Sequence, residues 1–184
     1  ALQKDQPEVL EKWRAFIEIS MSHCGEIYSD LNVTLRPKDT FGESQYKGTI
    51  PSIMETLSEE GLLTESNGAL CVFLDEFTDK NGEKQAVIVQ KSDGGYLYAT
   101  TDLAAIRHRA HELEADRILY FVDARQTLHF KQIFALARKA GLCTPHLVLR
   151  HISNGAILNK AGKPFKTRDG NTVKLADLIK ESRD

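Results

Sequence analysis

The sequence lacks the features that mark membrane and secreted proteins. It has no run of about 18 apolar residues, and its N-terminus lacks the basic, apolar and small-residue order of a signal peptide. Repeats and low-complexity segments are also absent. The 184 residues, 41% apolar and 27% charged, allow one sizeable hydrophobic core. We therefore expect a soluble, cytoplasmic protein.

Cysteine and net charge are both scarce. The three cysteines, Cys24, Cys71 and Cys143, form no CxxC pair and each lies in or beside an apolar stretch, which favours buried, reduced thiols over disulfides. The 24 basic and 26 acidic side chains leave a net charge of −2, whereas nucleic-acid binding usually requires a basic patch. If RNA binds, we expect its main docking surface to lie elsewhere.

Apolar spacing predicts two helices in the first third of the chain. Residues 9–31 repeat apolar side chains at helical spacing after Pro7, which predicts one long amphipathic helix. A short strand is expected at residues 33–35. A second helix is expected at residues 50–60, with Pro51 in its first turn and Gly61 after its last.

The pattern then changes to strands. The β-branched runs 69–74 and 85–90 flank an Asn-Gly turn, which predicts an antiparallel hairpin, and a third strand is expected at 96–99. Beyond it, helices at 101–114 and 127–140 alternate with strands at 118–122 and 146–149. This order predicts an α/β fold with a parallel βαβ unit, preceded by the antiparallel strands.

Ligands of parallel sheets bind beyond the carboxyl ends of the strands, which directs attention to the turn after residue 122. Asp123 could accept hydrogen bonds from a ribose, or it could cap the next helix. Gln126 and His129 lie three residues apart near a helix N-terminus, where phosphate is favoured. A half-buried, hydrogen-bonded histidine is the alternative for His129.

Two further segments carry candidate binding groups. Tyr98 and Asp102 bracket a strand-to-helix turn, where a carboxylate beside an aromatic ring suits a guanidinium ligand. The alternative is structural, with Thr101 as N-cap and Asp102 in the first helical turn. The glycine-bounded segment 162–170 contains Lys163 and Lys166, which suit a loop that stabilises phosphoryl charge, or simply a solvated basic turn.

Five blocks of this sequence resemble the arginyl-tRNA synthetases, a class I aminoacyl-tRNA synthetase family, in both order and spacing. They are residues 41–44, 95–104, 122–130, 162–170 and 172–178. The resemblance implies the second half of a Rossmann-type catalytic domain. The resemblance runs from about Leu31 to the end, so we expect a long amphipathic helix and connection at 1–30, followed by a partial catalytic domain at 31–184. This second part contains a β insertion around 69–99 and ends with the Lys-Pro-Phe-Lys-Thr-Arg loop and the start of a helix.

The resemblance also implies a role for each candidate residue. Arginine binding falls to Tyr98, Asp102 and Gln126, ATP binding to Asp123 and His129, and catalysis to the loop residues Lys163 and Lys166. The loop differs from the general class pattern, because Phe165 stands where serine is usual. The implied reaction joins L-arginine to ATP as arginyl-adenylate, with Mg²⁺ accompanying the nucleotide, and then transfers arginine to tRNA(Arg).

The histidine motif that class I synthetases use for the nucleotide is missing from these residues. The resemblance therefore implies a fragment that is inactive alone, from a parent that is expected to be monomeric and to contact tRNA mainly through other regions. One alternative is a truncated paralogue that binds arginine or nucleotide as a sensor or complex partner. Another is an interaction module whose motifs are only caps and turns. His108 and His111 have no evident third ligand, so no protein-bound metal is expected.

Overall fold

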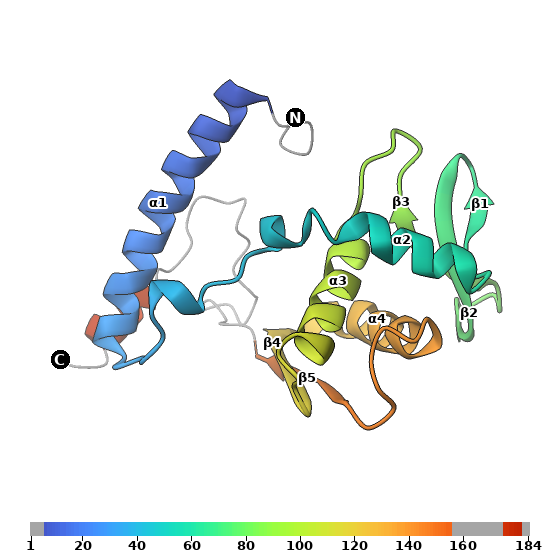
Figure 1. Ribbon diagram of the computed structural model, residues 1–184. Coiled ribbons are helices and arrows are strands. Elements are labelled where there is room, and N and C mark those ends of the chain that lie inside the picture. The colour runs from blue at the N-terminus through green and yellow to red at the C-terminus, as the bar shows by residue number, and fades with distance from the viewer. Residues whose placement is uncertain (1–5, 156–174, 182–184) are drawn as a thin grey trace. The chain divides into compact units, whose positions relative to one another are not determined.

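The computed structural model describes residues 6–155 and 175–181, and the chain divides into two compact units. Unit 1 comprises Ala1–Phe41 and Ala156–Asp184, and unit 2 comprises Gly42–Gly155 (Figure 1). Within the described residues, no helix has both the length and the apolarity needed to cross a membrane. The predicted split at residue 30 stays a prediction.

Unit 1 contains the long helix α1 (Pro7–Asp30), the 3-10 helix η2 (Pro37–Asp39) and the short helix α5 (Leu175–Glu181). Asn32 adopts φ 54° after α1, and Val33 donates its N–H to Tyr28 O at 2.8 Å. This left-handed residue ends the helix as glycine usually does. The strand predicted at 33–35 is wrong, because the described residues offer these backbone groups no ladder partner.

Unit 2 begins with the 3-10 helix η3 (Glu43–Tyr46) and helix α2 (Ile50–Glu59), followed by an antiparallel sheet in the order β1-β2-β3. Its strands are Thr64–Ser66, Ala69–Thr78 and Lys84–Gln90. Asp79 Oδ1 accepts hydrogen bonds from the N–H groups of Asn81 and Glu83, and Gly82 takes φ 81°. These bonds close the hairpin turn, and the predicted hairpin is confirmed.

The third predicted strand, at 96–99, is wrong. Tyr96 makes only an isolated bridge with Gln90, and helix α3 (Tyr98–His111) starts well before the predicted residue 101. The third strand is instead the short β1, whose polar sequence has no apolar alternation. Asp102 therefore lies in the second turn of α3, and Thr101 is not its N-cap.

The second half of unit 2 is a parallel βαβ unit, as predicted. Strand β4 (Arg117–Asp123) leads through the 3-10 helix η4 (Ala124–Gln126) into helix α4 (Thr127–Lys139), and β5 (Val148–Asn154) returns parallel to β4. Asp123 pairs with Asn154 at the carboxyl ends of the two strands. The structure thus confirms an α/β fold with parallel and antiparallel parts, although β5 extends further than predicted.

A single hydrophobic core holds unit 2 together. Helix α3 lies at its centre and contacts η3, α2, β3 and α4 (Figure 1). The largest fully buried apolar side chains come from α2, α3, α4 and the antiparallel sheet: Ile53, Leu57, Val72, Leu74, Val89, Leu103, Ile106, Ile133 and Leu136. Cys71 and Cys143 are buried free thiols, as expected, whereas Cys24 on α1 is only half-buried. Packing in this core fixes the positions of helices α3 and α4.

Candidate functional site

Asp123 is the last residue of strand β4, and its carboxylate accepts three hydrogen bonds from Arg125. Its Oδ1 accepts hydrogen bonds from Arg125 N at 2.8 Å and Nε at 2.9 Å, and its Oδ2 accepts one from Nη2 at 3.0 Å. These hydrogen bonds lower the pKa of Asp123 and raise that of Arg125, because each favours the charged form. The capping alternative is thus observed, although Asp123 caps η4 rather than α4.

Gln126 and His129 lie at the start of helix α4, as predicted. Gln126 occupies the N-cap position, but its side chain makes no capping hydrogen bond and is exposed to solvent. Thr127 stabilises the same turn by donating its hydroxyl to Ala124 O at 2.6 Å. The side-chain amide of Gln126 is therefore not used to cap the start of α4.

Asp102 and His129 meet across two helices. The Oδ2 atom of Asp102 lies 2.6 Å from Nε2 of His129, although the residues are 27 positions apart in sequence. Their side chains are 26% and 28% exposed, so the pair is half-buried but open on one side. This contact joins the N-terminal parts of α3 and α4, and it was not foreseen from the sequence.

Tyr98 occupies the first position of α3, one helical turn before Asp102. Residues four apart share a helix face, so the Tyr98 ring lies on the same side of α3 as the carboxylate. Its side chain is 70% exposed. The structure therefore brings Tyr98, Asp102 and His129, with Gln126, to adjoining helix ends. Lys163 and Lys166 lie outside the described residues.

The sequence reasoning missed a cluster around Arg109. Its guanidinium carbon lies 5.3 Å from the ring centre of Tyr120, and the buried Tyr46 is close to the same group. Burial raises the pKa of Tyr46 and raises that of Tyr120 to about 12, with the positive charge of Arg109 partly offsetting both shifts. Arg109 follows Asp102 by two helical turns on α3, a spacing that would have placed both on one face.

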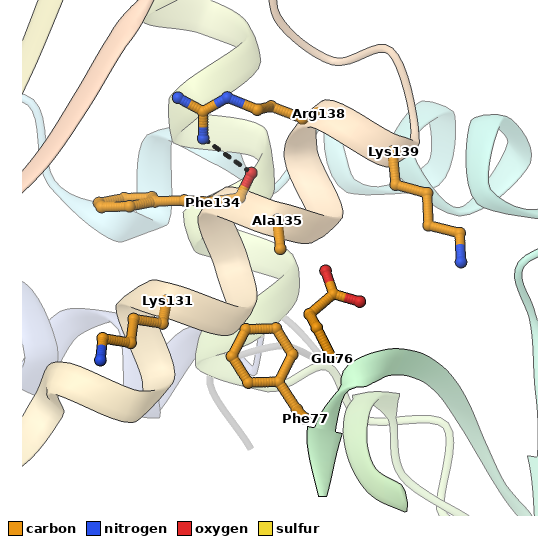
Figure 2. A pocket seen from close by; sticks show the side chains of 7 residues that line it. All are labelled: Glu76, Phe77, Lys131, Phe134, Ala135, Arg138 and Lys139. Atoms are coloured by element: carbon orange, nitrogen blue, oxygen red, sulfur yellow. Dashed lines mark hydrogen bonds between the residues drawn. The ribbon is translucent and has the colours of Figure 1, made fainter.

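Two surface hollows lie away from the predicted residues. Figure 2 shows the larger, of about 710 Å³, between β2 and α4. Glu76 and Phe77 reach into it from β2, and the cations of α4 border it, with Arg138 Nη1 donating to Phe134 O at 3.4 Å. The second, of about 450 Å³, follows the edge of β4 and includes Arg109 and Phe121. Neither hollow contains a candidate arginine or ATP residue.

His108 and His111, the two histidines considered for a metal, have other surroundings in the structure. Within residues 6–155 and 175–181, no three His, Cys, Asp or Glu side chains cluster closely enough to hold an ion. His108 pairs instead with Glu112 at 2.8 Å and packs edge-on against Tyr46 at 5.8 Å, while His111 is exposed. These contacts give His108 a structural role on helix α3.

Comparison with known proteins gives the family. The family described as tRNA synthetases class I (R), catalytic domain, matches residues 1–184. The chain is 53% identical over 182 residues to an arginine–tRNA ligase of Hahella chejuensis, covering 99% of this chain and 32% of that protein. For an arginine–tRNA ligase of Pseudomonas fluorescens, the identity is 54%, covering 100% of this chain and 32% of that protein.

The fold agrees with the sequence relationship. A crystal structure of arginyl-tRNA synthetase from Plasmodium falciparum superposes with a TM-score of 0.79 and 30% identity, covering 98% of this chain and 28% of that one. The chain thus spans about a third of the length of the curated relatives that it matches. On this evidence, the chain belongs to the class I arginyl-tRNA synthetase family and matches the catalytic domain of that family.

Proposed function

We propose that this chain is part of the catalytic domain of an arginine–tRNA ligase. The longer protein would activate L-arginine with ATP, forming arginyl-adenylate and pyrophosphate, and then transfer arginine to tRNA(Arg). One observation carries the proposal: in a member of this family, the half-buried carboxylate of Asp102 lies on the same helix face as the exposed ring of Tyr98.

These two side chains suit the guanidinium of arginine. A carboxylate accepts two parallel N–H bonds from a guanidinium, and an aromatic ring offers a surface on which the planar group stacks. The exposed amide of Gln126, just before α4, is the third residue assigned to arginine. Arginine would therefore enter between the N-terminal parts of α3 and α4.

ATP is assigned to the adjoining edge of the parallel sheet. Asp123 lies at the carboxyl end of β4, the position from which an acidic residue of this fold type contacts a ribose. Its link to Arg125 keeps the carboxylate ionised and oriented. Lys163 and Lys166 are assigned to the phosphates. Mg²⁺ would come bound to the nucleotide, and no described residue is assigned to it.

Catalysis on this proposal needs no protein nucleophile. The arginine carboxylate attacks the α-phosphate, the bond to pyrophosphate breaks, and pyrophosphate leaves. The protein aligns the two substrates and stabilises the negative charge of the transferring group. A cytoplasmic location and contacts to tRNA through other parts of the longer protein belong to the same proposal.

The free edge of β4 supports the proposal that other parts of the protein complete the sheet. Among the described residues, β4 pairs with β5 alone. Leu119 and Phe121 lie on the face of β4 opposite the buried Ile118 and Tyr120 and are 42% and 70% exposed, which is unusual for a parallel strand. Another part of the longer protein, packed on that face, would bury them.

The test is arginine-dependent exchange of pyrophosphate into ATP by the full-length protein with tRNA(Arg) present, because this family is expected to need bound tRNA for activation. Asp102→Asn is the critical variant. We expect kcat/KM for arginine to fall about 100-fold or more, because the guanidinium loses its charged partner. The matched control is Asp75→Asn, which removes an exposed carboxylate on β2 that pairs with Lys84 at 2.5 Å. Equal activity of Asp102→Asn and wild type would contradict the assignment, and no exchange by wild type would reject the function.

A further inference from the structure

The contact between Asp102 and His129 carries an inference about how arginine is recognised. A carboxylate only accepts hydrogen bonds, so Nε2 of His129 donates to Oδ2 of Asp102 across the 2.6 Å contact. The nitrogen that would otherwise be offered to a nucleotide is already used. His129 is therefore linked more directly to the arginine side of the site than to the ATP side.

Asp102 and His129 are each followed in sequence by a residue that packs in the core. His129 precedes Phe130, which is 5% exposed and packs against Tyr120 with ring centres 4.8 Å apart. Asp102 precedes Leu103, which is fully buried. Because the two backbones are fixed in this way, the histidine can hold the carboxylate in one orientation rather than follow it.

The contact leaves room for a guanidinium. An ionised carboxylate has about four acceptor positions, and His129 occupies one of them on Oδ2. Oδ1 and the remaining position on Oδ2 can still accept the two parallel N–H bonds of a guanidinium fork. The terminal torsion of an aspartate is otherwise broad, so a fixed orientation removes an ordering cost from binding.

We propose that His129 is a positioning residue for arginine: it orients the Asp102 carboxylate so that its open acceptor positions meet the guanidinium. This inference rests on the proposed function, and it gives His129 a role that differs from the nucleotide contact implied by the family resemblance. Removing the histidine leaves the charge of Asp102 in place but frees its rotation. The loss should therefore fall on arginine and leave ATP affinity unchanged.

The experiment measures KM for arginine and for ATP separately in pyrophosphate exchange by the full-length protein with tRNA(Arg) present. His129→Leu should raise KM for arginine about 10-fold or more and change KM for ATP by less than about twofold. His129→Gln retains an N–H donor and should recover most of the arginine affinity. His111→Leu, at an exposed position on α3, is the matched control and should match wild type.

A double-mutant cycle separates positioning from a general structural effect. If His129 acts through Asp102, then His129→Leu adds no further loss of arginine affinity in an Asp102→Asn background. Full additivity, an unchanged KM for arginine in His129→Leu, or an increase confined to KM for ATP would each overturn the inference while leaving the proposed function in place. Wild-type protein without arginine-dependent exchange would overturn both.

If His129→Leu does not fold, comparison of His129→Gln with His129→Asn keeps the test decisive. The shorter asparagine amide does not reach the position of Nε2, so only the glutamine variant should retain arginine affinity near that of wild type. Equal values of KM for arginine in these two variants would contradict the inference.

Discussion

Helices α1 and α4 are both amphipathic in sequence, but among the described residues only α4 contributes side chains that are classed as buried. Helix α4 contributes Phe130, Ile133, Leu136 and Ala137 to the core of unit 2. Helix α1 is 24 residues long, yet within the described part of the chain none of its residues is buried. Phe16 and Ile19 are 69% and 56% exposed.

The difference shows that an apolar stripe alone does not make a core. Tertiary packing supplies most of the stability of a helix in a folded protein, and a helix without it depends on its own hydrogen bonds and end caps. Proline at the start of α1 and the left-handed Asn32 at its end provide local support. We therefore expect substitutions in α4 to affect folding and similar substitutions in α1 to have little effect.

The largest expected effect comes from Ile133→Ala compared with Ile17→Ala. Ile133 on α4 is fully buried, and its truncation should lower the free energy of unfolding by about 2–5 kcal/mol because a cavity replaces packed atoms. Ile17 on α1 is 44% exposed, and its truncation should change stability by less than about 0.5 kcal/mol.

Urea unfolding of the 184-residue chain followed by far-UV circular dichroism measures both variants. The single tryptophan, Trp13, lies on α1, so its fluorescence reports separately on that helix. A loss for Ile17→Ala as large as that for Ile133→Ala would show that α1 is packed as tightly as α4.

We expect an intermediate effect when a buried hydroxyl group, that of Thr100, is removed, and little effect when an exposed one, that of Ser20, is removed. The fully buried Thr100 donates its hydroxyl to Val89 O and thereby links α3 to β3. Thr100→Val keeps the shape but leaves that carbonyl without this donor, which should cost about 1–3 kcal/mol.

Ser20 on α1 is the comparison, because its hydroxyl donates to Phe16 O at 2.7 Å in an exposed position. Ser20→Ala should be neutral or slightly stabilising, since water replaces the bond and alanine favours helix. The midpoint of urea unfolding measures both changes. A neutral Thr100→Val would contradict the view that the α3–β3 link depends on this hydrogen bond.

The elements that could be predicted are those whose local signals agree with their packing. Helix α2 has proline in its first turn and Gly61 at φ 64° after it, and the hairpin has the Asn-Gly turn. The start of α3 was missed because its N-cap, Leu97, offers no capping side chain, and Tyr98 and Thr100 favour strands by propensity. At this position tertiary packing outweighs the local strand preference, because Thr100 donates its hydroxyl to Val89 O on β3.

The candidate site shows the same limit. The capping role of Asp123 is local, so the residue type and its position after a strand were enough to propose it. The contact between Asp102 and His129 joins residues 27 positions apart, and nothing in either local pattern indicates it. Family resemblance assigned the two residues to different ligands, whereas the fold places them in one hydrogen bond.

The smallest expected effects come from two glycines, and they have opposite signs. Gly141 follows α4 at φ 64° with open space around its Cα, so Gly141→Ala adds only backbone strain and should cost about 1 kcal/mol. Gly25 lies inside α1, also with open space, and Gly25→Ala should stabilise that helix by about 0.5–1 kcal/mol.

Unfolding by urea measures the first change, and hydrogen-exchange protection of the α1 amides measures the second. Because α1 buries no residue among those described, its added stability should appear as stronger protection of α1 alone, with the unfolding midpoint of unit 2 unchanged. A matching rise in that midpoint would mean that α1 and unit 2 unfold together. Helices α1 and α4 would then differ only in the exposure of their side chains, because both would unfold in the same cooperative transition.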